Sequence, residues 1–460
     1  MKLRITACLV FPLVFGCAPS GRSPDLGAIY SAAAKADHSE RNPIIVIPGL
    51  LGSKLVDGNG RTVWGEFGAG AVDLGKAEGR NLLALPMGGS GWPQDGLRPD
   101  GALEKVKVSL GLDFKFEAYS GMLRAFGAGG YLDSAHSQLG DVDYGPGHFT
   151  CFQFGYDWRR SCAENARLLG CFIEEKRKYV QDERFRRSGK RSEVKFDIVA
   201  HSMGGLVGRY YLMYGGRALA EEGRMIPGWE GAKHVEKLIM VGTPNDGSIY
   251  PLPQLLEGYK LAPFLPKIDA AVVGTMPSMY ELLPPAGLNA VIDKNSKPVP
   301  ILESEPWEWC GWGLVDPEQD SVLIDLLPGV DSRAERSAIA RRHLSKMLAN
   351  ARAFHRAIGA GGKPPAGTEI HAFAGDSEST ASRAQLDAKG VLQLIDYVPG
   401  DGVVTRKSML GDKRDATQAG QRLRSSIPWS DVNFVSSDHK GMTRDPAFVD
   451  NVLHLLLERP

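Results

Sequence analysis

Short apolar runs alternate with amphipathic stretches along much of the chain. Continuous runs of apolar residues predict strands at 43–48, 149–156, 194–200, 235–241, 368–374 and 432–435. Apolar residues at helical spacing predict helices over 162–180, 206–214, 334–358 and 446–457. Strands that alternate with helices are typical of a parallel sheet with helices on its faces, so the pattern predicts an α/β fold with a mostly parallel central sheet.

Two long stretches interrupt this alternation. Residues from about 56 to 145 are glycine-rich and irregular, and residues from about 249 to 330 hold a proline-rich tract and three tryptophans between 307 and 312. The aromatic and aliphatic content of both stretches argues against disorder. We therefore expect a lid insertion and a cap insertion over the carboxyl edge of the sheet, within one domain that covers residues 43–460.

The N-terminus has the pattern of an export signal. Lys2 and Arg4 precede an apolar core that is too short to span a membrane. The ending LVFGC resembles a bacterial lipoprotein cleavage box and predicts lipidation of Cys17. Residues 1–17 would then be a signal peptide and polar residues 18–42 a tether to the membrane of the bacterial cell envelope. The alternative is an ordinary signal peptide and a secreted or periplasmic soluble protein.

Charge and cysteine content narrow the possible partners. Basic and acidic residues number 54 each, so no net field favours nucleic acid, and 43% hydrophobic content is that of a soluble globular protein. The four cysteines beyond residue 17 permit two disulfides with three possible connectivities, or remain buried free thiols: Cys151, Cys162, Cys171 and Cys310. None has the spacing of a metal site, and we expect no metal and no organic cofactor.

The strongest local motif is FDIVAHSMGGLV at residues 196–207. An apolar strand runs directly into Ser202, and a helix with a small-residue start follows. This is the sequence form of a nucleophile elbow, with Ala200 at its first small position. Small residues on both sides of the serine let strand and helix approach closely, while the sharp turn exposes the hydroxyl. The alternative interpretation is an ordinary strand-to-helix turn with an incidental serine.

A serine nucleophile needs a base and an acid, which in this kind of fold follow it in the order acid, then histidine. Asp401 lies in a glycine turn, and His439 follows the last predicted strand. Asp376 and Asp246 also follow strands and are competing acids. His201 is a rival base in number only, because a residue beside the serine on the elbow points away from the pocket.

Acyl transfer also requires backbone donors for the developing oxyanion. One donor is expected from the residue after the nucleophile, Met203. The other is expected from the loop PGLLGS at residues 48–53, where the Leu50 N–H is the candidate. The alternative interpretation of that loop is a structural turn at the end of a strand.

Four blocks occur in an order that resembles the lecithin:cholesterol acyltransferase family, which includes lysosomal-type phospholipases. They are IVIPGLLGS at 45–53, YDWR at 156–159, AHSMGG at 200–205 and GDGVV at 400–404. The resemblance implies an α/β-hydrolase fold with cap and lid, a catalytic triad of Ser202, Asp401 and His439, and oxyanion donors at Leu50 and Met203. It favours Asp401 over Asp376. This chain departs from the family's animal members, whose lid carries a disulfide, because no cysteine lies between Cys17 and Cys151.

The expected function is a serine-dependent acyl hydrolase or acyltransferase for lipid esters, such as phospholipids or acylglycerols. The apolar insertions favour a long acyl chain, which needs a slot shielded from water. Two alternatives stay open: an esterase for small esters or a peptidase with the same triad, and a non-catalytic lipid-binding lipoprotein.

Overall fold

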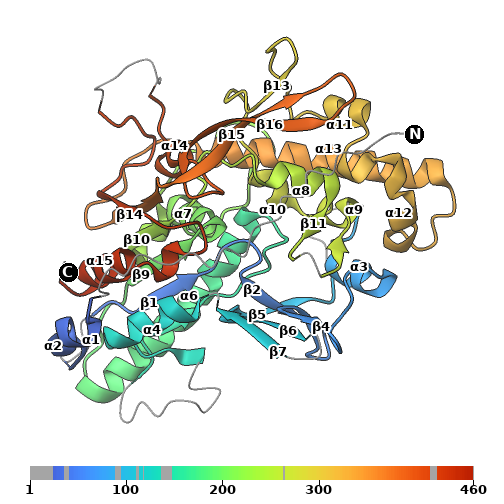
Figure 1. Ribbon diagram of the computed structural model, residues 1–460. Coiled ribbons are helices and arrows are strands. Elements are labelled where there is room, and N and C mark those ends of the chain that lie inside the picture. The colour runs from blue at the N-terminus through green and yellow to red at the C-terminus, as the bar shows by residue number, and fades with distance from the viewer. Residues whose placement is uncertain are drawn as a thin grey trace.

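A six-stranded sheet forms the centre of the protein (Figure 1). The computed structural model describes residues 24–35, 41–88, 95–109, 113–117, 119–135, 148–262, 265–414 and 422–458. The sheet has the order β17-β14-β10-β9-β1-β8, and all neighbouring strands are parallel. Its strands are β1 (Ile44–Ile47), β8 (Cys151–Gln153), β9 (Phe196–His201), β10 (Val235–Val241), β14 (Glu369–Gly375) and β17 (Asp431–Val435). The predicted α/β class is confirmed.

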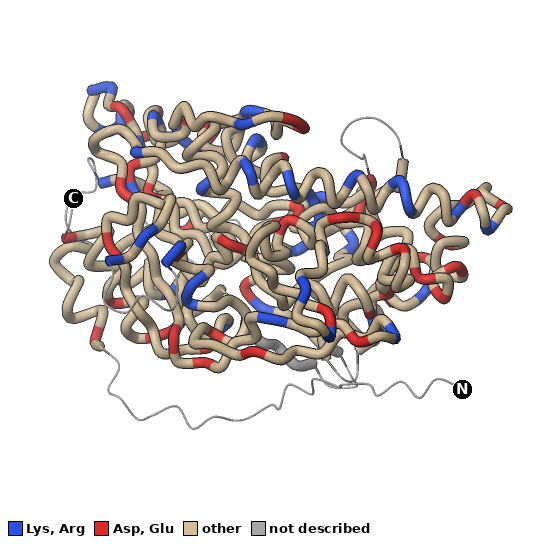
Figure 2. The backbone as a smooth tube through the Cα atoms, turned by 90° about the horizontal axis from the view of Figure 1, so that it is seen from above, with Lys and Arg blue, Asp and Glu red and all other residues tan. Residues whose placement is uncertain are grey.

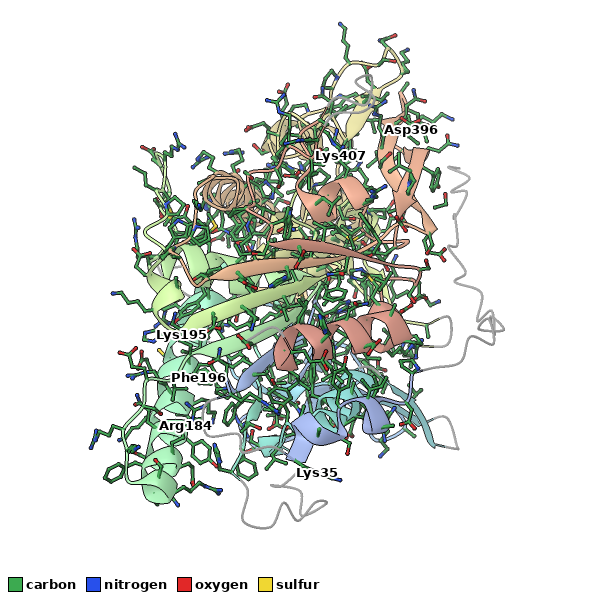
Figure 3. The ribbon with its side chains drawn as sticks, turned by 90° about the vertical axis from the view of Figure 1, so that its left-hand side faces the viewer. Lys35, Arg184, Lys195, Phe196, Asp396 and Lys407 are labelled. Atoms are coloured by element: carbon green, nitrogen blue, oxygen red, sulfur yellow. The ribbon has the colours of Figure 1, made fainter. Side chains whose placement is uncertain are left out.

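Helices cover both faces of this sheet. Successive residues of a strand point to opposite faces, so Ile45 and Ile47 join one apolar cluster whereas Ile44 and Val46 join another. The first cluster is closed by α6 (Cys162–Ser188), α7 (Met203–Tyr214) and α13 (Arg333–Ile358). The second is closed by α4 (Ser120–Ala128) and α15 (Pro446–Leu457). In Figure 3, Lys195 and Phe196 mark the amino end of β9, and Arg184 lies on α6 below them.

The first insertion is built mainly from two small sheets. Their orders are β3-β2-β5 and β4-β6-β7. The elements are β2 (Ser53–Val56), β3 (Thr62–Trp64), β4 (Glu66–Gly68), α3 (Ala77–Leu83), β5 (Arg98–Ala102), β6 (Lys105–Ser109) and β7 (Asp113–Glu117). The insertion is therefore folded, as its aromatic content predicts.

The second insertion is mostly helical and contacts the first. Its elements are α8 (Pro251–Glu257), β11 (Tyr259–Lys260), β12 (Lys267–Ile268), α9 (Ala270–Val273), α10 (Pro277–Glu281), β13 (Val291–Asp293), α11 (Ser304–Cys310), the 3-10 turns η2 (Gly313–Val315) and η3 (Pro317–Gln319), and α12 (Asp320–Leu326). Arg80 of α3 forms ion pairs with Asp269 at 2.7 Å and Asp325 at 2.9 Å. These contacts join the two insertions, and α13 runs past them to α12 (Figure 1).

A hairpin that the sequence pattern did not predict precedes Asp401. Strands β15 (Glu378–Leu386) and β16 (Leu392–Gly400) pair antiparallel, and β13 of the second insertion pairs with β15. Exposed polar residues interrupt both strands, so no continuous apolar run marks them. The remaining elements are η1 (Glu230–Lys233), α14 (Arg406–Leu410) and η4 (Met442–Arg444).

The predicted tether is partly wrong. Within residues 18–42, α1 (Leu26–Ile29) and α2 (Ser31–Lys35) pack on the domain. Tyr30 between them is buried, and its hydroxyl donates to Asp450 Oδ1 of α15 at 2.9 Å. This single aromatic anchor gives no periodicity that a sequence pattern would reveal. Cys17 and the predicted signal peptide at 1–17 lie outside the described residues, so lipidation and export stay predictions.

Charges of both signs are interspersed over the backbone (Figure 2). This mixed distribution agrees with the equal numbers of basic and acidic residues. Across the described ranges, no helix combines the length and the apolar character that a membrane span needs.

Candidate active site

Ser202 lies in the turn between β9 and α7, with φ 53° and ψ −126°. A left-handed φ is strained for a residue with a Cβ atom. Neighbouring glycines allow the close packing of this turn, since a Cβ on Gly204 would lie 2.4 Å from the Pro48 carbonyl oxygen. A Cβ on Gly205 would lie 1.9 Å from Thr243 Oγ1. The small residues of the motif are therefore required by the backbone around the serine.

Three predicted residues meet at the carboxyl edge of the sheet. Ser202 Oγ lies 2.9 Å from His439 Nε2, and His439 Nδ1 lies 2.7 Å from Asp401 Oδ2. Asp401 is buried, and its other carboxylate oxygen accepts hydrogen bonds from the N–H groups of Val403 and Val404 at 3.0 and 2.7 Å. The carboxylate is thus fixed in orientation. With Nδ1–H donating to Asp401, Nε2 is left to accept the serine proton.

The two competing acids take other positions. Asp246 is paired with the Lys413 ammonium group, and its N–H donates to Ser408. Asp376 follows β14, but His439 Nδ1 bonds to Asp401 instead. The end of β14 contacts Asp401 directly, because a Cβ on Gly375 would lie 2.7 Å from Asp401 Cβ. The strand end therefore approaches the site, while the carboxylate comes from the loop after β16.

The loop predicted to hold the second oxyanion donor passes over the nucleophile. A Cβ on Gly49 would lie 2.8 Å from Ser202 Cβ. Among the described residues, neither the Leu50 N–H nor the Met203 N–H donates a hydrogen bond to the protein. Met203 is the first residue of α7, where N–H groups lack partners within the helix. Both donors are therefore available to an oxygen bound above Ser202.

Aromatic residues of the YDWR segment hold this loop from behind. The Tyr156 hydroxyl donates to the Pro48 carbonyl oxygen at 2.9 Å, and the Tyr156 N–H donates to Ser53 Oγ at 3.0 Å. Trp158 Nε1 donates to the Ser53 carbonyl oxygen at 3.3 Å. Arg159 is fully buried, pairs with Asp157 and donates to the Leu83 carbonyl oxygen at 3.1 Å. The YDWR segment thus fixes the backbone of the 48–53 loop next to Ser202.

The ring nitrogens of His201 bond to Tyr119 and to the His439 backbone rather than to the Ser202 hydroxyl, and the ring lies beside that of His439. It lies 4.9 Å from the His439 ring between centroids. Its Nε2 contacts the His439 carbonyl oxygen and its Nδ1 contacts the Tyr119 hydroxyl, both at 2.9 Å. Neither His201 nor Tyr119 was predicted from the sequence to act in the site. No motif surrounds Tyr119, and the elbow position of His201 drew attention only as a rejected base.

An apolar cavity opens beside Leu50. It is lined by residues of the 48–53 loop, by Trp158 and by the second insertion: Leu50, Leu51, Trp158, Tyr250, Pro251, Gln254, Tyr259, Ile268, Val273, Met276 and Met279. Almost all of its surface is hydrocarbon or aromatic ring. Eight of the lining residues belong to the second insertion, from Tyr250 to Met279, so this insertion supplies most of the wall next to Leu50.

The cysteines that follow residue 17 are free thiols. Cys151 and Cys162 are buried, Cys310 is half-buried and Cys171 is exposed. Within the described ranges, no group of three or more histidine, cysteine, aspartate or glutamate side chains could hold a metal ion.

The sheet, the strained serine turn and the three side chains above it correspond to an α/β-hydrolase. Residues 129–308 match the family model described as lecithin:cholesterol acyltransferase. The resemblance to the lecithin:cholesterol acyltransferase family is confirmed. The match contains the YDWR segment and the Ser202 turn. It supports action on lipid esters, as an acyl hydrolase or an acyltransferase. No curated protein sequence matches the chain.

Three solved structures are similar to this chain at low identity. The Tle4–Tli4 complex has a TM-score of 0.49 and 16% identity, covering 90% of this chain and 98% of that one. The mature form of Bacillus licheniformis lipase BlEst2 has a TM-score of 0.35 and 12% identity, over 92% and 95%. Phospholipase PlaB from Legionella pneumophila has a TM-score of 0.31 and 12% identity, over 74% and 56%.

Proposed function

We propose that the protein is a serine acyl hydrolase or acyltransferase for lipid esters, with Ser202, His439 and Asp401 as its catalytic triad. The observation that carries the proposal is a chain of two hydrogen bonds through His439. Ser202 Oγ lies 2.9 Å from His439 Nε2, and His439 Nδ1 lies 2.7 Å from the buried Asp401 carboxylate. Such a hydrogen-bond chain is what a serine needs in order to lose its proton during attack on an ester carbonyl.

The reaction follows from these contacts. Ser202 Oγ bonds to the ester carbonyl carbon while its proton passes to His439 Nε2, and Asp401 stabilises the imidazolium through Nδ1–H. The Leu50 and Met203 N–H groups donate to the oxyanion. The intermediate collapses, the C–O bond to the alcohol breaks, and His439 returns the proton to the departing alkoxide. Water or an alcohol then attacks the acyl-enzyme by the same steps in reverse.

The apolar cavity beside Leu50 supports a lipid acyl chain as the bound group. Leu50 lines the cavity, so an ester whose carbonyl oxygen meets the Leu50 N–H would be bound beside it. Burying apolar surface stabilises the complex by about 0.8 kcal/mol for each methylene group. The long acyl chain of a phospholipid or acylglycerol can bury several methylene groups, whereas a small ester or a peptide offers few.

The first test is product analysis on phosphatidylcholine vesicles, with and without cholesterol or a long-chain alcohol. Wild type is compared with Ser202→Ala and with Ser188→Ala, a surface serine at the end of α6. We expect Ser188→Ala to match wild type, and Ser202→Ala to lose about 10⁴-fold or more in rate. Acyl chains released as fatty acid or found on the alcohol identify the acceptor.

Two results would overturn parts of this proposal. Undiminished turnover by folded Ser202→Ala would remove the serine mechanism. No turnover of any lipid by wild type, together with Ser202-dependent cleavage of short soluble esters, would replace the lipid assignment by that of a small-ester esterase.

A further inference from the structure

Tyr119 and His201 connect the two loops that flank Ser202. Tyr119 belongs to the first insertion, just before α4, and is buried. Its hydroxyl oxygen accepts a hydrogen bond from the Gly49 N–H at 2.7 Å and lies 2.9 Å from His201 Nδ1. His201 Nε2 lies 2.9 Å from the His439 carbonyl oxygen. Four segments far apart in sequence are thus joined by three hydrogen bonds.

The direction of each hydrogen bond follows from the groups involved. The His439 carbonyl oxygen only accepts, so His201 Nε2 carries a proton and donates it. A neutral imidazole then has a bare Nδ1, which accepts from the Tyr119 hydroxyl. That leaves the Tyr119 oxygen to accept from the Gly49 N–H. Every donor has one acceptor, so the arrangement is fully satisfied only with His201 in its neutral, Nε2-protonated form.

Burial and the neighbouring His439 lower the pKa of His201 to about 3. The ring is therefore uncharged at the pH at which a serine hydrolase works. A neutral ring adds no charge repulsion when His439 receives the serine proton, although the two ring centroids are only 4.9 Å apart.

We propose that Tyr119 and His201 are positioning residues that fix the Gly49–Leu50 loop and the His439 loop relative to Ser202. This inference rests on the proposed function. Tyr119 engages the Gly49 N–H, so that group is not available to the oxyanion, and the Leu50 N–H follows it in the loop. His201 fixes the carbonyl of His439, while the His439 N–H donates to the Asp401 carbonyl oxygen at 2.8 Å.

The arrangement connects the first insertion to the geometry around Ser202. Without Tyr119, the loop over Ser202 and the histidine loop are no longer joined through His201. Misplacement of a reacting group by about 1 Å is enough to cost about 100-fold in rate. The insertion would therefore influence the rate of the chemical step as well as the entry of substrate.

The decisive variant is Tyr119→Phe, which removes one oxygen atom and leaves the buried ring. Its matched control is Tyr214→Phe at the far end of α7, a buried tyrosine whose hydroxyl donates to the Ala357 carbonyl oxygen at 2.9 Å. We measure kcat and KM on a soluble ester, the rate of covalent labelling by a fluorophosphonate, and the melting temperature. For Tyr119→Phe we expect kcat and the labelling rate to fall about 10- to 100-fold, with KM within about twofold of wild type. Tyr214→Phe should keep the wild-type kcat, and both variants should show similar melting temperatures.

Substitution of His201 tests the other half of the connection. His201→Gln keeps an N–H donor near the His439 carbonyl oxygen, whereas His201→Leu does not. We expect His201→Gln to retain about tenfold more activity than His201→Leu. The double variant Tyr119→Phe/His201→Leu should be no slower than His201→Leu alone, because groups that act as one unit are not additive.

Three outcomes would overturn the inference: a wild-type kcat and labelling rate in folded Tyr119→Phe, a loss confined to KM, or additive losses in the double variant. If His201→Leu does not fold, Tyr119→Phe and His201→Gln still decide the matter. Failure of the proposed function is a different result, because wild type itself would then not be labelled at Ser202.

Discussion

The carboxyl edge of the central sheet and the two insertions above it contribute to the site in different ways. At the edge, Ser202 and His439 occupy the loops after β9 and β17 of the central sheet, and Asp401 occupies the loop after β16 of the hairpin. In the insertions, Tyr119 reaches the site from the turn before α4, and the cavity residues between 250 and 279 come from short helices and strands of the second insertion. The edge supplies the groups that carry out proton transfer, and the insertions supply loop orientation and an apolar wall.

This difference explains why sequence motifs mark the residues at the sheet edge and do not mark those of the insertions. Parallel strands end at a common edge, so residues just after them converge whatever separates them in sequence. The nucleophile and the base can therefore be found from the ends of parallel strands. The acid Asp401 follows β16 of the antiparallel hairpin instead, and only the GDGVV block at 400–404 indicates it. The insertions reach the site through packing between distant segments, which fixes shape and apolarity and leaves the residue types free to vary.

The largest effect is expected at the sheet edge, from Asp401→Asn. An amide in place of the carboxylate favours the wrong tautomer of His439 and no longer stabilises its charge. We expect kcat to fall by about 10⁴-fold. The control is Asp376→Asn, which should remain within about twofold of wild type in the same ester assay. A large loss in Asp376→Asn with activity retained in Asp401→Asn would move the acid to the end of β14.

A smaller effect is expected in the cap, from Met276→Phe. The larger ring fills part of the apolar cavity, so long acyl chains should lose about tenfold in kcat/KM relative to short ones. A series of nitrophenyl esters from four to sixteen carbons measures this shift. Met213→Phe, the same substitution in buried α7, controls for general strain in the core. An equal loss at every chain length would assign the cavity to structure rather than to substrate.

The smallest effect on activity is expected from Asp197→Asn, at the opposite end of the strand that feeds Ser202. Burial raises the pKa of Asp197 to about 7, with the nearby Lys237 partly offsetting the rise. The folded protein favours the protonated acid, so the contribution of Asp197 to stability is fully present below pH about 4. It is lost as pH rises from about 4 through the folded pKa of about 7.

The asparagine variant removes that loss and keeps an oxygen for the Lys237 N–H, which Asp197 Oδ1 accepts at 3.1 Å. Urea unfolding should show the variant gaining on wild type as pH rises from 4 to 8, by about 4 kcal/mol in the free energy of unfolding. Its kcat should be unchanged. A stability difference that does not depend on pH would contradict the raised pKa.

Sequence alone predicted the sheet to within a few residues. The limits of β10 are those predicted, while β8 is shorter and α6 extends to Ser188 instead of ending at 180. The extra turns of α6 are strongly charged, so apolar spacing does not reveal them. The hairpin of β15 and β16 was missed because its strands are half-exposed and polar.

The sequence predicted those residues of the candidate site whose type is required by the proposed reaction. Ser202, Asp401, His439, Leu50 and Met203 all lie together, and their catalytic roles stay proposals. Tyr119 could not be predicted, because its role depends on how close its hydroxyl lies to Gly49 and His201 in the folded chain. No local sequence pattern encodes that proximity. The contacts of His201 could not be predicted for the same reason. The motif places His201 beside Ser202 and does not indicate the hydrogen-bond partners of its ring.

The backbone of Ser202 has a consequence for how such an enzyme evolves. Its φ of 53° and ψ of −126° cost roughly 1–3 kcal/mol for a residue with a side chain. Glycine at this position would remove the backbone strain, and the variant would be more stable but would lack the nucleophilic hydroxyl. Selection for heat tolerance alone would therefore favour loss of the hydroxyl, so laboratory evolution of this chain has to select for turnover in every round.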